Sequence, residues 1–314
     1  MMKSPLDLKF VFVVGKGGVG KTSVSCALAL AAAARGKRVL VAMCNAKERL
    51  SYLLQTGPIG ANIQPVLPNI DAVNMEPGAA LEEYGMLVLR VRALYRVVFE
   101  NRFVKAFLRG TPGIDAWAML GKAQYHAREQ DPDGHDRYDL VIVDAPATGH
   151  GLDLLRVPRV IMDVAPPGLL RREAERASEL FLDPERAAVL LVTIPEEMPA
   201  TETIELHAAI RNELNLPVCG LVINQTLPAL FSEHELGLFR SLADKLPPES
   251  ALRPVVIASR ARAEHEQIQR SCIGRLARAL PIPQIKLPFT LVSDFRRHEI
   301  ERLSGLLGQG FAPR

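Results

Sequence analysis

The stretch GKGGVGKT, residues 15–22, decides the fold of this chain. The apolar run from Leu8 to Val14 precedes it and predicts a buried strand, and the helix formers from Thr22 to Arg35 predict a helix after it. Glycines at the first and sixth positions, followed by lysine and threonine, match the phosphate-binding loop pattern, which requires this strand-loop-helix context. The stretch therefore predicts a nucleotide phosphate site at the start of an α/β fold.

The loop composition indicates how phosphates would be held. Glycines let successive backbone N–H groups turn toward the phosphate oxygens, and the following helix presents its positive end. Lys21 would neutralise the β and γ oxygens, and the Thr22 hydroxyl would bind Mg²⁺, so we expect ATP and Mg²⁺ as cofactors. The predicted contact residues are Gly15, Lys16, Gly17, Gly18, Val19, Gly20, Lys21, Thr22 and Ser23.

Further short apolar runs predict the rest of a sheet. Because their hydrophobicity is continuous, both faces of each strand should be covered by the helical segments between them. The fold class is α/β, doubly wound, with a mostly parallel sheet of about seven or eight strands. The predicted strands after the first are Arg38–Met43, Ile70–Met75, Leu140–Asp144, Ala187–Ile194, Val218–Asn224, Pro254–Ala258 and Ile282–Leu287.

Residues 77–137 interrupt this alternation with a mostly helical pattern, so we predict one domain over residues 1–314 with a helical subdomain inserted at 77–137. We expect Trp117 and Met119 to be core residues. The segment from Tyr84 to Gly110 mixes apolar and basic side chains and could hold a hydrophobic client or touch acidic lipid, but its cations do not gather on one helical face, which favours helices packed on their own core. These cations are Arg90, Arg92, Arg96, Arg102, Lys105 and Arg109.

Composition excludes several classes of protein. The formal charge is +3 and no run of five like charges occurs, so no nucleic-acid partner is expected. The four cysteines lie far apart without a C-x-x-C pair, as expected of reduced thiols in the cytoplasm. No apolar stretch is long enough to predict a transmembrane segment.

Lys16 adds a second lysine to the loop, directly after its first glycine. Together with DAPATGH at 144–150, IPEEM at 194–198 and VINQ at 222–225, the loop resembles the arsenite-pump ATPase family, which includes the ATPases that target tail-anchored proteins. The resemblance implies that Lys16 reaches across a dimer interface to the partner's nucleotide, in a homodimer or in a heterodimer with a paralogous ATPase. The alternative is an ordinary solvated lysine.

The same resemblance assigns residues outside the loop. Asp144, at the end of a predicted strand, would hold Mg²⁺ through water, and Gly149 would permit a rearrangement that senses the γ-phosphate. His150 is weak evidence for catalysis by itself. Asn224 would hydrogen-bond the adenine base, and Pro288 and Phe289 would line the base pocket.

One position departs from the family pattern. Asn45 stands where the family carries the aspartate that orients the attacking water, and an amide cannot accept a proton as a carboxylate does. Glu48 could substitute, although a charged surface turn is the simpler interpretation. Lys16, Lys21 and Asn45 remain the catalytic candidates, and hydrolysis is in question.

The resemblance does not extend to every feature of the family. The zinc-binding cysteine pair at the dimer contact and the metalloid-binding trio are both missing from this sequence, and Asp153 to Arg186 is too short for the Met-rich helical insertion of the targeting members. Two hypotheses follow: a nucleotide-gated dimer that acts on an unidentified protein or hydrophobic client, or a hydrolysis-impaired nucleotide-binding subunit that pairs with an active paralogue.

Overall fold

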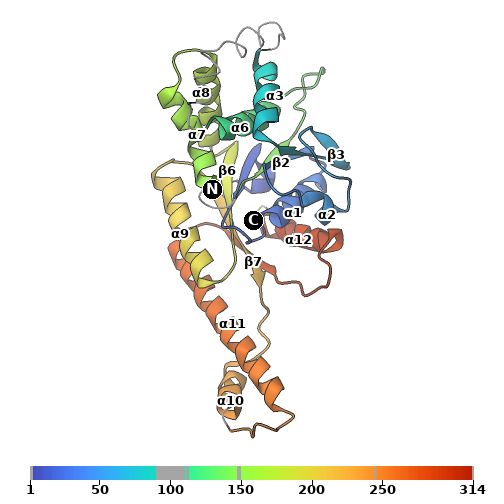
Figure 1. Ribbon diagram of the computed structural model, residues 1–314, viewed down its shortest axis with the longest axis vertical. Helices are drawn as coiled ribbons and strands as arrows, with labels where there is room; N and C mark the ends of the chain where they lie inside the picture. Colours follow the sequence, from blue (N-terminus) through green and yellow to red (C-terminus); the bar gives the residue numbers. More distant parts are fainter. Residues whose placement is uncertain (1–2, 90–109, 111–112, 147–149, 244, 313–314) are drawn as a thin grey trace.

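The computed structural model describes residues 3–89, 110, 113–146, 150–243 and 245–312, and its centre is one twisted sheet with helices on both faces (Figure 1). The eight strands follow the order β3-β4-β2-β5-β1-β6-β7-β8. They are β1 (Phe10–Val14), β2 (Val39–Cys44), β3 (Gln64–Leu67), β4 (Ile70–Met75), β5 (Leu140–Asp144), β6 (Ala187–Thr193), β7 (Val218–Thr226) and β8 (Gln284–Pro288). All neighbouring strands are parallel except β3 and β4. The predicted fold class is confirmed.

Two apolar cores explain why the central strands are continuously hydrophobic. Alternate side chains of β1 enter opposite cores, Phe10 and Phe12 on one face and Val11 and Val13 on the other. The second face is covered by α1 (Lys21–Ala33), α2 (Leu50–Leu54) and α12 (Arg297–Gly310), and a short 3₁₀ turn, η1 (Pro5–Asp7), precedes β1. The first face is covered by α3 (Pro77–Leu89), α6 (Ile114–Ala127), α7 (His150–Val164), α8 (Leu169–Leu182) and α9 (Glu197–Asn212).

Within residues 77–137 the structure describes two helices, α3 and α6, of which α6 packs against β5 and β2, and a loop over residues 128–137. Trp117 is fully buried and Met119 is 7% exposed, so both predicted core residues lie in the first core. The Tyr84 and Trp117 rings meet edge to face, which joins α3 to α6. The six cations predicted between Arg90 and Arg109 lie outside the described residues.

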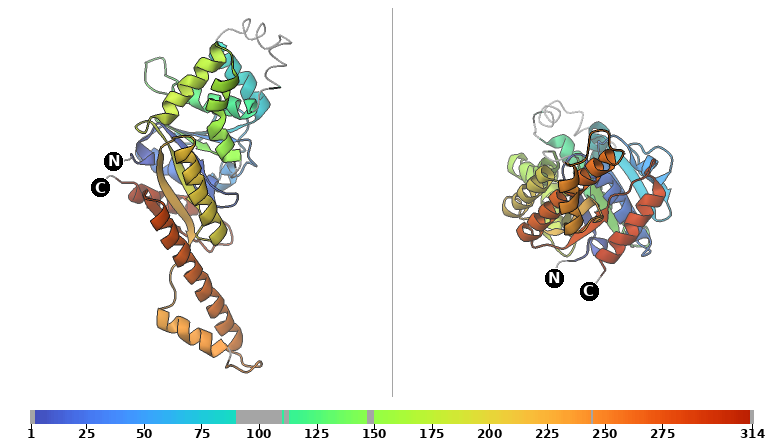
Figure 2. Two further views of the ribbon diagram at one scale, coloured as in Figure 1. Left: turned by 90° about the vertical axis from the view of Figure 1, so that its left-hand side faces the viewer. Right: turned by 90° about the horizontal axis from the view of Figure 1, so that it is seen from below.

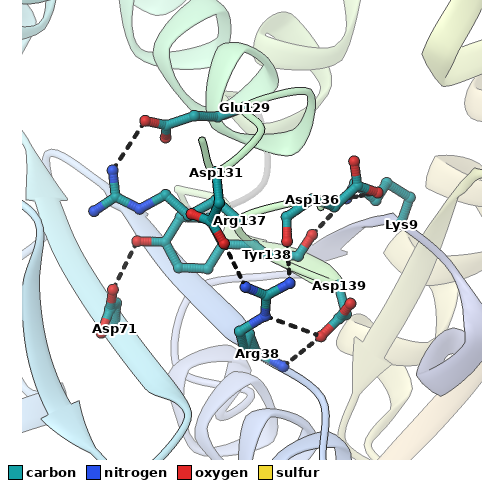
Figure 3. Close-up of polar contacts among 9 residues, drawn as sticks. All are labelled: Lys9, Arg38, Asp71, Glu129, Asp131, Asp136, Arg137, Tyr138 and Asp139. Carbon is teal, nitrogen blue, oxygen red and sulfur yellow. Dashed lines mark hydrogen bonds and ion pairs between the residues drawn. The ribbon is translucent and has the colours of Figure 1, made fainter. Parts of the chain in front are cut away.

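An ionic network fixes the loop between α6 and β5 at the amino ends of the strands (Figure 3). The Arg38 guanidinium lies 2.7 Å from the Asp131 carboxylate, and the backbone N–H of Arg38 donates to Asp139. The Lys9 ammonium lies 2.8 Å from Asp136. Because these ion pairs are partly exposed, each contributes little alone, but together they hold the loop in one arrangement. This loop therefore covers the amino ends of the strands. The phosphate loop lies at the opposite end of the sheet, at the carboxyl end of β1.

One strand prediction is wrong, and one strand was not predicted. Residues 254–258, predicted as a strand, lie inside the 27-residue helix α11 (Arg253–Ala279), where Pro254 occupies the first turn, a position that tolerates its missing N–H. The edge strand β3 was not predicted, because it carries no buried apolar run.

The long helix α11 and its short partner α10 (Glu233–Ala243) form a hairpin that projects from the body (Figures 1 and 2). The hairpin lies at one end of the elongated molecule, and the helices α3, α7 and α8 lie at the other. In the part of the chain that the structure describes, no helix has both the length and the apolar character required to cross a bilayer.

Candidate nucleotide-binding site

The phosphate loop connects the carboxyl end of β1 to the start of α1, as predicted. The Lys21 ammonium donates to the backbone carbonyl oxygens of Gly15 at 3.1 Å and of Lys16 at 3.0 Å, so the side chain lies under the loop. Burial lowers the pKa of Lys21, and the nearby Asp144 carboxylate opposes this shift. A partly desolvated cation inside a turn of backbone amides can neutralise an anion that enters the loop.

Two glycines of the loop cannot be replaced without moving the backbone. A Cβ on Gly15 would lie 2.1 Å from the carbonyl oxygen of Val192 on β6. Gly20 has φ of +91°, in the left-handed region, and its Cβ would lie 2.3 Å from Nδ2 of Asn224. The loop therefore packs directly against the ends of β6 and β7.

Asp144 ends β5 beside the loop because the parallel register pairs it with Val13 of β1. Its carboxylate accepts hydrogen bonds from the Thr22 hydroxyl at 2.6 Å and from the Ser25 hydroxyl at 3.3 Å. Burial raises the pKa of Asp144, although the hydrogen bond from Thr22 and the charge of Lys21 counteract the rise.

These oxygen atoms fit a Mg²⁺ ion. A buried carboxylate and a hydroxyl provide the hard oxygen ligands that this cation prefers, directly or through water. The positive charge of a cation would also offset the cost of burying an ionised Asp144. The two residues predicted for the metal, Thr22 and Asp144, are brought together.

Lys16 points away from its own loop. Its ammonium lies 2.6 Å from the Glu202 carboxylate and 3.0 Å from the Met198 sulfur, both on α9. The two charged side chains are 29% and 32% exposed, and Met198 is 65% exposed. Lys16 is therefore at the surface in an ion pair within this chain, while Lys21 alone serves the loop interior.

Asn45 is exposed at the end of β2 with φ of +46°, a conformation that asparagine tolerates better than most residues. Its backbone N–H donates to the carbonyl oxygen of Met75 at 2.8 Å. The Glu48 carboxylate accepts from the backbone N–H and the hydroxyl of Ser51. Glu48 thus caps the start of α2, which agrees with the structural interpretation of this residue rather than with a catalytic one.

The residues predicted for the base line one cavity of about 140 Å³. Asn224 is buried, and its Nδ2 donates to the carbonyl oxygen of Val19 at 2.9 Å, which leaves Oδ1 as the acceptor. Phe289 is 43% exposed at the rim of the site. The cavity is lined by Gly20, Ser23, Asn224, Gln225, Pro288, Phe289, Thr290, Phe295 and Leu303.

The remaining predicted residues are placed as follows. Val19 is buried, whereas Gly17 and Gly18 are exposed at the mouth of the loop. Gly149 lies outside the described residues. Ser25 was not predicted, although it follows Thr22 by three positions and so shares its helix face. Glu202 was also missed, and no sequence signal could have found it because it lies 186 residues from Lys16.

The cysteines form neither a disulfide nor a metal site within the described residues. Cys26, Cys44, Cys219 and Cys272 are free and buried. Burial raises the pKa of Cys219 to about 12 and also raises the pKa of Cys26 and Cys44, so these thiols stay protonated at neutral pH. Among the residues that the structure describes, no group of three or more His, Cys, Asp or Glu side chains could hold a metal ion.

Comparisons with known proteins place this site in a family. The profile of the anion-transporting ATPase family matches residues 8–165 and 170–241. The ATPase BagA of Mycobacterium tuberculosis is 26% identical over 237 residues, covering 72% of this chain and 67% of the relative. An arsenical pump-driving ATPase of Acidiphilium multivorum is 26% identical over 339 residues, covering 96% and 56% of the two chains. An ATPase ASNA1 homolog of Entamoeba dispar is 27% identical over 263 residues, covering 70% and 77%.

The match spans the phosphate half of the site, whereas Pro288 and Phe289 of the base cavity lie beyond it. It includes the phosphate loop, Asp144, α9 and β7, and it covers more than half of the chain. The chain spans little more than half the length of the Acidiphilium pump ATPase. This protein belongs to the anion-transporting ATPase family, a family of ATP-binding ATPases.

Proposed function

We propose that this protein is a nucleotide-gated dimer, in which Mg²⁺-ATP brings two chains together and the change of state acts on an unidentified protein or hydrophobic client. The observation that carries the proposal is the direction of Lys16, whose ammonium extends over α9 to Glu202 instead of over its own loop. A second loop lysine that faces outward is available to phosphates held by another chain.

Exposed apolar side chains around the site support association. Met198 contacts Lys16, Phe289 lies at the rim of the base cavity, and Leu291 and Val292 follow it along the chain, with Leu291 89% exposed. Large apolar groups beside a polar site are typical of surfaces that bind another protein. We assign this face to the dimer.

Each chain would hold its nucleotide with its own loop. We assign phosphate neutralisation to Lys21 and the metal to Thr22 and Asp144, and Mg²⁺ would supply charge that stabilises the β and γ oxygens. The free Oδ1 of Asn224 can accept a hydrogen bond from a base amino group, as adenine offers. Pro288 and Phe289 would pack against the base ring.

Hydrolysis by the isolated chain should be slow. Asn45 can orient water through its amide but cannot accept a proton, and Glu48 is engaged in capping α2. This favours a second candidate function, in which the chain is a nucleotide-binding subunit whose hydrolysing partner is a paralogue.

A single-turnover assay with radiolabelled ATP tests these functions. We expect the purified wild type to bind ATP and release phosphate slowly, Asn45→Asp to accelerate release by about tenfold or more, and Lys21→Ala to abolish binding. Phosphate release only after addition of a co-purifying paralogue would favour the second candidate. Release that survives in Lys21→Ala would refute the assignment of the site.

A further inference from the structure

A cavity of about 560 Å³ lies between α3, α6 and α8, where α6 ends. This volume is typical of sites that bind small molecules. Figure 1 shows the three helices together at the end of the molecule opposite the hairpin. The cavity is separate from the nucleotide site, because it lies where the loop over the amino ends of the strands begins, whereas the phosphate loop lies at their carboxyl ends.

A group of charged side chains forms the polar wall of this cavity. The buried Glu173 carboxylate accepts from Nη1 of Arg176 at 2.6 Å and from Nη2 of Arg128 at 3.0 Å, and each guanidinium keeps further N–H groups. Glu129, the other acid of the wall, is already paired with Arg137 at 2.9 Å (Figure 3). Among the described residues that line the cavity, two cations therefore share one carboxylate, which leaves a net positive charge.

Buried donors without a partner lie behind this wall. The fully buried Gln124 accepts from Arg128 at 2.9 Å through Oε1, but its Nε2 has no hydrogen-bond partner within the described residues. The same is true of the Tyr84 hydroxyl, in a residue that is 4% exposed, and of Nε of Arg128. Buried polar atoms are paired in most proteins, so three unpaired donors in one place indicate a site for an acceptor.

These donors come together through the spacing of residues on α6. Gly121, Gln124 and Arg128 are three and four residues apart, so they share one helical face. The Tyr84 ring covers this face, because a Cβ on Gly121 would lie 2.6 Å from Cζ, the ring carbon that carries the hydroxyl. Burial raises the pKa of Tyr84 and the charge of Glu173 raises it further, while the two arginines oppose the rise. The hydroxyl therefore stays protonated, as a donor beside the charged wall.

Apolar side chains form another part of the lining. Leu87 and Val88 come from the last turn of α3, and Leu169 is the first residue of α8. All three are half-buried. The cavity thus offers a cationic, donor-rich wall and an apolar surface to the same occupant.

We propose that this cavity binds a small organic anion, whose carboxylate or phosphate group pairs with Arg128 and Arg176 while its apolar chain lies on the leucine and valine side chains. The planar guanidinium group matches both oxyanions. A cation would be repelled by the net positive charge, and a neutral apolar molecule would leave the buried donors unpaired. All of the lining residues belong to one chain, so binding needs no dimer.

Calorimetric titration of the full chain tests the ligand class. Octanoate and octyl phosphate are the probes for the two oxyanions, and at least one should bind saturably with one molecule per chain. Octylamine, octanol and inorganic phosphate should each bind at least about tenfold more weakly, since each lacks either the anionic group or the apolar chain. Octanol that binds as tightly as octanoate and octyl phosphate would overturn the proposal, and so would the absence of saturable binding of both anions at millimolar concentration.

One pair of substitutions on α8 tests the location. Arg176→Gln should weaken binding of the better anion by about tenfold or more, because it removes a charged donor from the wall. Arg171→Gln is the matched control: Arg171 pairs with Glu175 in the same helix, and this variant should bind the anion as the wild type does. ATP binding by both variants should be normal, which shows that they fold. Equal anion affinity in the two variants and the wild type would place the ligand elsewhere and overturn the site.

Tyr84→Phe tests the unpaired hydroxyl. The ring is kept, and loss of a buried donor without a partner should leave the Tm of the ligand-free protein unchanged or higher. Affinity for the anion should fall several-fold. A lower Tm with unchanged anion affinity would show that the hydroxyl serves the fold instead of a ligand, and would contradict the proposed site.

Discussion

The contact between Lys16 and Glu202 should oppose dimerisation, and Glu202→Gln should therefore strengthen it. If Lys16 serves a partner's nucleotide, it must first leave Glu202. The Lys16 ammonium and the Glu202 carboxylate are 2.6 Å apart, and each side chain is about one third exposed. A partly screened ion pair of this kind stabilises the free chain by about 0.5–1 kcal/mol. A symmetric dimer breaks two such pairs, or about 1–2 kcal/mol. This corresponds to a dimer dissociation constant that is about 5–30 times lower in the variant.

Sedimentation equilibrium in ATP and Mg²⁺, repeated at low and high salt, measures this constant. The gain should shrink as salt rises, because the lost ion pair is itself screened. Glu205→Gln is the matched control: it removes the same charge from α9 at an exposed position, three residues from Glu202. A Glu202→Gln variant that dimerises more weakly than the control would show that Glu202 serves the interface, and would refute the reasoning.

Three further variants test the site. Asp144→Asn should stabilise the nucleotide-free protein at neutral pH by about 1–3 kcal/mol, or several degrees in Tm, while abolishing Mg²⁺-dependent ATP binding. Because burial raises the pKa of Asp144, this advantage should vanish as pH falls below the ordinary carboxyl range, and an equal Tm for both proteins at pH 7 would contradict the shift. Gly20→Ala should lower the free energy of unfolding by about 2 kcal/mol or more and weaken ATP binding, because the new Cβ would meet Asn224 and φ at this position is positive. Unchanged thermal unfolding and ATP-binding curves would refute the close contact between Gly20 and Asn224. Asn224→Ala should weaken ATP binding and reduce discrimination against GTP in competition titrations, and equal discrimination would remove Asn224 from base recognition.

The part of the fold that is local in sequence could be predicted. Runs such as Ile70–Met75 and Leu140–Asp144 became strands with the predicted bounds, because continuous apolar character requires cover on both faces. Strand order could not be predicted in this way. The position of β5 between β2 and β1 depends on contacts between segments that are far apart in the sequence.

The failures also have physical causes. Residues 254–258, Pro-Val-Val-Ile-Ala, look like a strand, but Pro254 suits the first turn of a helix, and the good helix formers that follow at residues 260–267, Arg-Ala-Arg-Ala-Glu-His-Glu-Gln, extend the helix over the β-branched run. β3 is a half-exposed edge strand that contains Pro65. Its hairpin with β4 turns at Pro68 and Asn69, and Asn69 has φ of +61°, so the turn residues were the available signal.

Some features of the site could also be predicted from the sequence, and others could not. The loop, Asp144 and the base residues follow from short motifs, and the structure brings them together. The Lys16 contact with Glu202 depends on how α9 packs beside the phosphate loop, and no motif encodes it.

The central claim, that nucleotide state gates a dimer through Lys16, is tested most directly by sedimentation velocity of the wild type and Lys16→Ala in Mg²⁺ with ATP and with ADP. The account predicts a dimer only for the wild type with ATP, and near-normal nucleotide binding by Lys16→Ala, since Lys21 serves the loop of the same chain. The same oligomeric state for both proteins in both nucleotides would contradict it.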